Sequence, residues 1–144
     1  MKKILTYLFA TLCLTTACGQ SKEQQAQKSQ NDSIQAQVNF DNIFVNEFAE
    51  LIADTSVVVL DVRTAKEFAE GHIKRAMNID FLQEGFLEKA KIQLPKDKTI
   101  AVYCRSGKRS ANVAGKLSNL GYKMVNMKGG ILAWKAAEMP LTTE

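Results

Sequence analysis

The feature that most constrains the fold is a pair of continuous apolar runs. Residues 57–60 read Val-Val-Val-Leu, and residues 99–103 read Thr-Ile-Ala-Val-Tyr. Short runs rich in β-branched side chains are typical of strands that are covered on both faces, as in a parallel sheet. A half-exposed strand would alternate apolar with polar side chains, and neither run does so. The sequence therefore predicts a sheet with helices packed on both faces.

Helical patterns and weaker strands flank these runs. Thr64 is placed to cap a short helix, because Glu67 follows at the capping-box position. Further strands are expected at 76–79 and 123–127, and further helices at 42–53, 81–92, about 107–120 and 129–138. Strands that alternate with helices predict an α/β fold, here a single domain with a central, mostly parallel sheet flanked by helices.

The first part of the chain has a different texture. Lys2 and Lys3 precede an apolar run from Ile4 to Leu14, which has the length of a secretory signal and falls far short of the roughly 20 residues of a membrane span. A stretch dominated by Gln, Ser, Lys and Asn follows and offers too little apolar surface to fold. We expect a signal peptide at 1–17, a flexible tether at 18–38 and the folded domain at 39–144.

Cys18 stands where the signal would be cut. With Gly19 after it and small residues before it, the segment resembles a bacterial lipoprotein signal, although Thr15 holds the place where such signals usually carry Leu. The resemblance implies that Cys18 is acylated and that the protein is held by lipid at the periplasmic face of a bacterial membrane. A soluble periplasmic protein with an unmodified Cys18 is the alternative.

Charge and cysteine content limit the classes of ligand and partner that we expect for this chain. Lys2 and Lys3 account for two of the 19 basic side chains, which leaves 17 against 15 acidic ones, too even a balance to favour nucleic acid. Of the three cysteines, Cys13 lies in the apolar run and Cys18 at the cut, so Cys104 remains as a free thiol. The sequence has a single His and no C-x-x-C pair, so we expect no metal site and no cofactor.

Cys104 ends a predicted buried strand and begins the loop Cys104–Arg109, after which a helix starts. Ligand sites in parallel α/β sheets lie at the carboxyl ends of strands. The loop N–H groups and the positive end of the helix dipole would stabilise an anion there, and Arg105, Lys108 and Arg109 add positive charge. We expect the thiol at the mouth of this loop, with a pKa below the free value of about 8.5, and Gly107 where backbone approaches a ligand.

The loop resembles the active-site loop of rhodanese-like domains, whose pattern C-x-x-G-x-R is met by Cys104, Gly107 and Arg109. Three further pieces match in order over residues 40–140: Asp61-Val62-Arg63; Glu67-Phe68 with Gly71-His72-Ile73 and Ala76, Asn78 and Ile79; and Gly129-Gly130 with Trp134.

The resemblance implies a sulfurtransferase. Cys104 would take the outer sulfur of an anionic donor such as thiosulfate, hold it as a persulfide and pass it to cyanide or a thiol, a thioredoxin-like protein being one such acceptor. The candidate substrate-binding residues are Arg105, Ser106, Gly107, Lys108, Arg109 and Arg63. His72 falls in the family's Gly-His-Ile turn, where a structural role is expected, and Asp61 is expected to bind Arg63 or nearby backbone.

Two other functions stay open. Phosphatases and arsenate reductases of the cysteine-loop kind also place a thiolate in a backbone nest, but their loop is C-x5-R, whereas Arg109 gives C-x4-R here. A sulfur carrier or redox relay would use Cys104 without turnover. For Arg105 and Lys108, a solvated basic face is the alternative to contact with the substrate.

Overall fold

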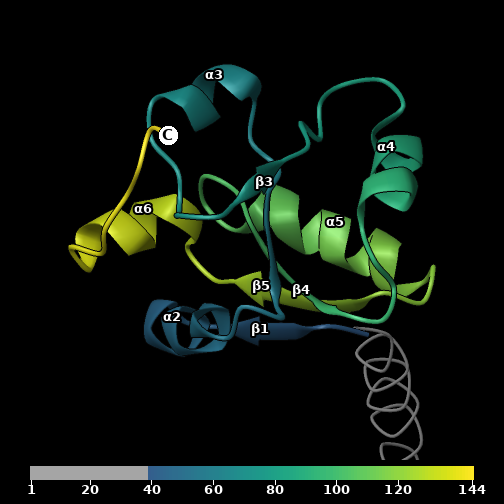
Figure 1. Ribbon diagram of the computed structural model, residues 1–144, viewed down its shortest axis with the longest axis horizontal. Coiled ribbons are helices and arrows are strands. Elements are labelled where there is room, and N and C mark those ends of the chain that lie inside the picture. The colour runs from purple at the N-terminus through teal and green to yellow at the C-terminus, as the bar shows by residue number, and fades with distance from the viewer. Residues whose placement is uncertain (1–38) are drawn as a thin grey trace, which may run out of the picture. The chain divides into compact units, whose positions relative to one another are not determined.

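The computed structural model describes residues 39–144 (Figure 1). In chain order the elements are β1 (Asp41–Ile43), α2 (Val45–Ala53), β2 (Val58–Asp61), α3 (Ala65–Ala69), β3 (Met77–Asn78), α4 (Phe86–Gln93), β4 (Thr99–Tyr103), α5 (Lys108–Ser118), β5 (Lys123–Met127) and α6 (Gly130–Ala136). Within this range the strands form one five-stranded sheet in the order β1-β5-β4-β2-β3, and all its pairs are parallel. The predicted α/β fold with a parallel sheet flanked by helices is confirmed.

Helices cover both faces of the sheet (Figure 1). Helices α4 and α5 pack on one face, and α2 and α6 pack on the other. Strand β4 shows the alternation: Ile100 and Val102 join the first cluster, whereas Ala101 and Tyr103 join the second. Because both faces are buried, β2 and β4 need apolar side chains at nearly every position, which explains their continuous runs.

The direction of the strand connections reverses between β2 and β4. The chain leaves β2 towards β3 on one side and leaves β4 towards β5 on the other. Asp61 lies opposite Tyr103 in the register, so both strands end at the same level. Ligands of open α/β sheets bind where the direction of the connections reverses. Here the segment after Asp61 and the loop that begins at Cys104 meet at this point.

The structure corrects the starts of two expected helices. The helix expected over 42–53 is wrong at its start, because Asp41–Ile43 is strand β1 and pairs with Val125–Met127 of β5. A strand of three residues is too short to show a period of two, and Ile43 fits either pattern. The helix expected over 81–92 starts only at Phe86, because Gly85 is left-handed at φ 75° and turns precede it.

The predicted signal peptide (1–17) and the tether (18–38) with Cys18 lie outside the described residues, and the domain boundaries stay predictions. Within residues 39–144, no helix is long and apolar enough to cross a membrane. The same residues contain no cluster of three or more His, Cys, Asp or Glu side chains suited to hold a metal ion.

Candidate active site

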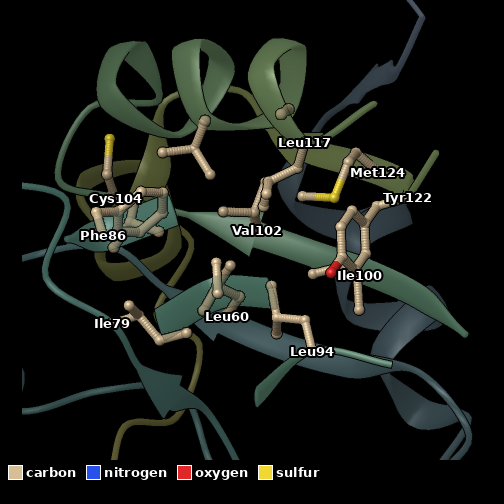
Figure 2. Close-up of a cluster of buried hydrophobic side chains, with 14 residues drawn as sticks. Leu60, Ile79, Phe86, Leu94, Ile100, Val102, Cys104, Leu117, Tyr122 and Met124 are labelled. Carbon is tan, nitrogen blue, oxygen red and sulfur yellow. The ribbon is translucent and has the colours of Figure 1, made fainter. Parts of the chain in front are cut away.

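Cys104 directly follows β4, and its sulfur is held by the start of α5. The Gly107 N–H donates to Sγ at 3.2 Å and the Ser110 hydroxyl donates to Sγ at 3.5 Å. Figure 2 shows Cys104 at one end of the cluster that contains Val102 and Phe86. The residue has 0% exposure, so the thiol lies beneath the loop rather than at its mouth as expected. Any molecule that is to react with Sγ would first have to displace the atoms that cover it.

Helix α6 holds the cysteine loop through backbone hydrogen bonds. The N–H groups of Ile131 and Leu132 donate to the carbonyls of Cys104 at 2.8 Å and Arg105 at 3.1 Å. A Cβ on Gly130 would stand 2.4 Å from the Cys104 carbonyl oxygen, closer than any side chain tolerates. The second glycine of Gly129-Gly130 is thus required by the close approach of α6 to the loop. These two carbonyls are bound to α6, whereas the loop amides of Ser106 and Gly107 donate hydrogen bonds to the sulfur.

The surroundings of Cys104 favour its anionic form. Burial raises the pKa of the thiol, but hydrogen bonds from the Ser110 hydroxyl and from the amides of Ser110, Ser106 and Gly107 outweigh burial and leave the pKa below its ordinary value. The lowered thiol pKa that the sequence predicts is confirmed. The main cause is hydrogen bonding rather than the positive side chains of the loop, since Arg105 and Lys108 are exposed.

Arg109 is bound to a carboxylate. Its Nη1 and Nη2 donate to Glu67 at 3.2 and 3.0 Å, and both side chains are about one-quarter exposed. The hydrogen bonds from the Arg109 guanidinium lower the pKa of Glu67 most, and burial raises it by less. With the hydrogen bonds from Thr64, which also lower it, the pKa of Glu67 falls to about 2. An anionic donor would have to compete with Glu67 for Arg109. Arg105, Ser106 and Lys108 are exposed on the loop, and Gly107 is buried within it.

Arg63 lies in a buried ion pair. Its Nε and Nη2 donate to the Asp61 carboxylate at 2.6–3.0 Å, and Nη2 also donates to the Gly71 carbonyl at 2.9 Å. The expected contact between Asp61 and Arg63 is confirmed. This pair joins the end of β2 to the Gly-His-Ile turn. A role of Arg63 in substrate binding stays a prediction.

His72 is buried in the same region. Its ring nitrogens contact the carbonyls of Phe68 at 3.0 Å and Glu144 at 3.1 Å, and its ring stacks on Phe68. The structure therefore gives His72 backbone contacts that agree with the structural role expected for it.

Sequence reasoning missed Ser110. The residue lies three positions after Gly107 and six after Cys104, in the first turn of α5. Side chains in a helix lean towards its N-terminus, so a first-turn serine points back at the loop. The position of Ser110 in the first turn is the sequence feature that could have identified it. Using that feature depends on knowing that the helix begins at Lys108.

Known proteins match this chain in sequence and in fold. The rhodanese-like domain family matches residues 44–137. A putative sulfurtransferase of Bacillus subtilis is 40% identical over 88 residues, which cover 61% of this chain and 82% of that protein. The thiosulfate sulfurtransferase GlpE of Coxiella burnetii is 38% identical over 90 residues, covering 60% and 79%.

A solved structure supports the same assignment. The rhodanese-related protein of Thermoplasma volcanium superposes with a TM-score of 0.66 at 36% identity, and the match covers 73% of this chain and 100% of that one. The family model covers more than half of the chain, and the chain belongs to the rhodanese-like domain family.

Proposed function

We propose that the protein is a sulfurtransferase that moves a sulfane sulfur from a donor such as thiosulfate to cyanide or a thiol through a persulfide on Cys104. The observation that carries the proposal is the position of Sγ, which lies at the base of a loop and receives hydrogen bonds from Gly107 and Ser110. Such donors favour the thiolate, which is the nucleophilic form of cysteine.

The reaction balances without an external oxidant or base. The Cys104 thiolate attacks the outer sulfur of thiosulfate, the bond between the two donor sulfurs breaks, and sulfite leaves with the electron pair. The negative charge then lies on the outer sulfur of the persulfide. Cyanide or a thiolate attacks that sulfur, the bond to Sγ breaks, and Sγ leaves as the thiolate. In each step the loop amides stabilise negative charge close to the helix start.

Two observations support sulfur rather than phosphate as the transferred group. The loop from Cys104 to Arg109 is one residue shorter than the C-x5-R loop of the phosphatases. A smaller loop suits one sulfur atom better than a tetrahedral phosphate, and the Coxiella burnetii relative is named a thiosulfate sulfurtransferase.

The test is steady-state turnover with thiosulfate and cyanide, measured as thiocyanate and sulfite formed. We expect both products in equal amounts from the wild-type protein and neither from Cys104→Ala. The same preparations are assayed with an aryl phosphate and with arsenate. Hydrolysis or reduction there, without thiocyanate from thiosulfate or polysulfide, would overturn the proposal.

A sulfur carrier or redox relay is a second candidate, favoured by the complete burial of Cys104. A carrier would be loaded and unloaded by a docking protein that opens the loop, and it would turn over small donors poorly. It predicts a persulfide on Cys104 after exposure to donor, with little thiocyanate produced per hour.

We also propose that the protein is a lipoprotein anchored at the periplasmic face of a bacterial membrane through acylated Cys18. The support is the order of Lys2 and Lys3, the apolar run and Cys18-Gly19. Expressed in a bacterium, the wild-type chain is expected in the detergent phase of a detergent–water partition and Cys18→Ser in the aqueous phase. Equal partitioning of the two into water would leave an exported soluble protein.

A further inference from the structure

Ser110 has two acceptors for a single hydrogen. Its Oγ lies 3.5 Å from Cys104 Sγ and 3.2 Å from the Gly107 carbonyl oxygen, and the residue is completely buried. A hydroxyl donates one hydrogen, so one of these acceptors receives it at a time. A change of acceptor needs only rotation of the O–H bond, because Oγ is within reach of both.

The Gly107 carbonyl keeps partners whichever way Ser110 turns. It accepts the Ala111 N–H at 3.1 Å and lies 3.5 Å from Asn126 Nδ2. The hydroxyl therefore leaves no buried carbonyl without a donor when it turns to the sulfur. Turning away from a charged sulfur would remove one of its hydrogen bonds, so the charge on Sγ decides the direction.

That charge changes during the proposed reaction. In the free enzyme the negative charge is on Sγ, whereas in the persulfide it is on the outer sulfur and Sγ is bonded to two atoms and neutral. We propose that Ser110 is a catalytic residue whose hydroxyl bonds Sγ in the thiolate, turns to the Gly107 carbonyl in the persulfide, and returns to Sγ as the persulfide is discharged. This inference rests on the proposed sulfurtransferase function.

The two half-reactions should respond differently to loss of the hydroxyl. In discharge Sγ is the leaving group, and a thiolate with a lower pKa leaves faster. In loading Sγ is the nucleophile, and its intrinsic reactivity falls as its pKa falls, by about threefold per unit. Ser110 therefore speeds discharge and supplies thiolate near neutral pH, but it does not speed loading once the thiol is fully ionised.

The variants are Ser110→Ala, Ser110→Thr and the control Ser118→Ala. Ser118 lies on the same helix, and within residues 39–144 its hydroxyl has no hydrogen-bond partner. The first readout is the pH profile of iodoacetamide alkylation, followed at Cys104 by peptide mass so that Cys13 and Cys18 do not contribute. We expect Ser110→Ala to move the midpoint up by about one pH unit or more, and Ser110→Thr and Ser118→Ala to stay near the wild type.

The second readout separates the half-reactions. Each protein is loaded with thiosulfate, then mixed with cyanide in a single turnover, at one pH above all the alkylation midpoints. We expect Ser110→Ala to load at least as fast as the wild type and to discharge about threefold or more slowly.

An unshifted alkylation profile, or loading and discharge slowed by the same factor, would overturn the role of Ser110. A wild-type protein that forms no persulfide from thiosulfate or polysulfide would instead overturn the proposed function, while the alkylation profile would still report the hydrogen bond from Ser110.

Discussion

Arg109 and Glu67 form a two-pronged ion pair between the cysteine loop and helix α3, with Nη2–Oε1 at 3.0 Å and Nη1–Oε2 at 3.2 Å. The same carboxylate accepts hydrogen bonds from the N–H and the hydroxyl of Thr64, both at 3.0 Å. Thr64 is the residue that caps α3. One side chain thus completes a helix cap and holds the arginine of the family motif. The charge that Arg109 presents to an anionic donor is largely neutralised by this contact.

Glu67→Gln should strengthen the binding of an anionic donor. The change removes a negative charge beside the loop and leaves Arg109 free to bind thiosulfate. We expect the KM for thiosulfate to fall about fivefold, as for a gain of about 1 kcal/mol, with a smaller change in kcat. Glu88→Gln removes the same charge from the exposed pair with Lys91 and is the control. A higher KM for Glu67→Gln would show that Glu67 orients Arg109 for the donor.

The same pair makes stability depend on pH. The pKa of Glu67 is lowered from 4.5 to about 2 in the folded protein, so its ionised form stabilises the fold above pH 4.5. This contribution is lost as the pH falls through 4.5 towards 2. We expect wild type to be more stable than Glu67→Gln at pH 7 by about 1 kcal/mol and the difference to shrink below pH 4 in urea unfolding. A difference that is constant with pH would show that the ion pair contributes nothing.

Gly130→Ala should disrupt the cysteine loop. A Cβ there would meet the Cys104 and Arg105 carbonyl oxygens at 2.4 and 2.6 Å, and the residue has a φ of +58°. We expect a loss of about 3 kcal/mol in the free energy of unfolding and an altered alkylation rate at Cys104. Gly121→Ala has the same backbone problem at φ +88° but nothing within 4 Å, so it should cost about 1 kcal/mol and leave alkylation unchanged. Equal effects of the two changes would contradict the close approach of α6.

Arg63 provides a test of structural against substrate-binding roles. Arg63→Met leaves Asp61 buried without its partner, and we expect a loss of about 3–5 kcal/mol in the free energy of unfolding. Arg63→Lys keeps a charge but loses the two-pronged contact. At a temperature where Arg63→Lys is folded, its KM for thiosulfate should equal that of the wild type. A raised KM in the folded variant would place Arg63 in donor binding after all.

The parts of the fold that sequence predicts are those with local causes. The capping box of Thr64 and Glu67 appears as expected because its two residues are three apart, and β2 and β4 appear because burial on both faces demands apolar runs. The contact of Glu67 with Arg109 joins residues 42 positions apart and depends on how α3 and α5 meet. Strand β1 forms through its pairing with β5, for which three residues give no pattern.

The candidate site also contains residues that local sequence predicts and residues that only the folded chain brings together. Cys104 and Gly107 could be placed from the loop pattern and the strand before it, and the lowered pKa of the thiol followed from a helix start beside it. Ser110 could not, because its hydroxyl reaches Sγ only when the first turn of α5 is formed. The backbone position of the cysteine loop also depends on α6, which starts 26 residues after Cys104 and binds the loop carbonyls.

The most direct test of the central claim is the intact mass of the protein after incubation with thiosulfate, with and without cyanide, beside Cys104→Ala. The account predicts that the wild type alone gains the mass of one sulfur atom, that peptide mapping places this sulfur on Cys104, and that cyanide removes it with release of thiocyanate. An unchanged mass after thiosulfate and after polysulfide, or an equal gain on Cys104→Ala, would contradict it.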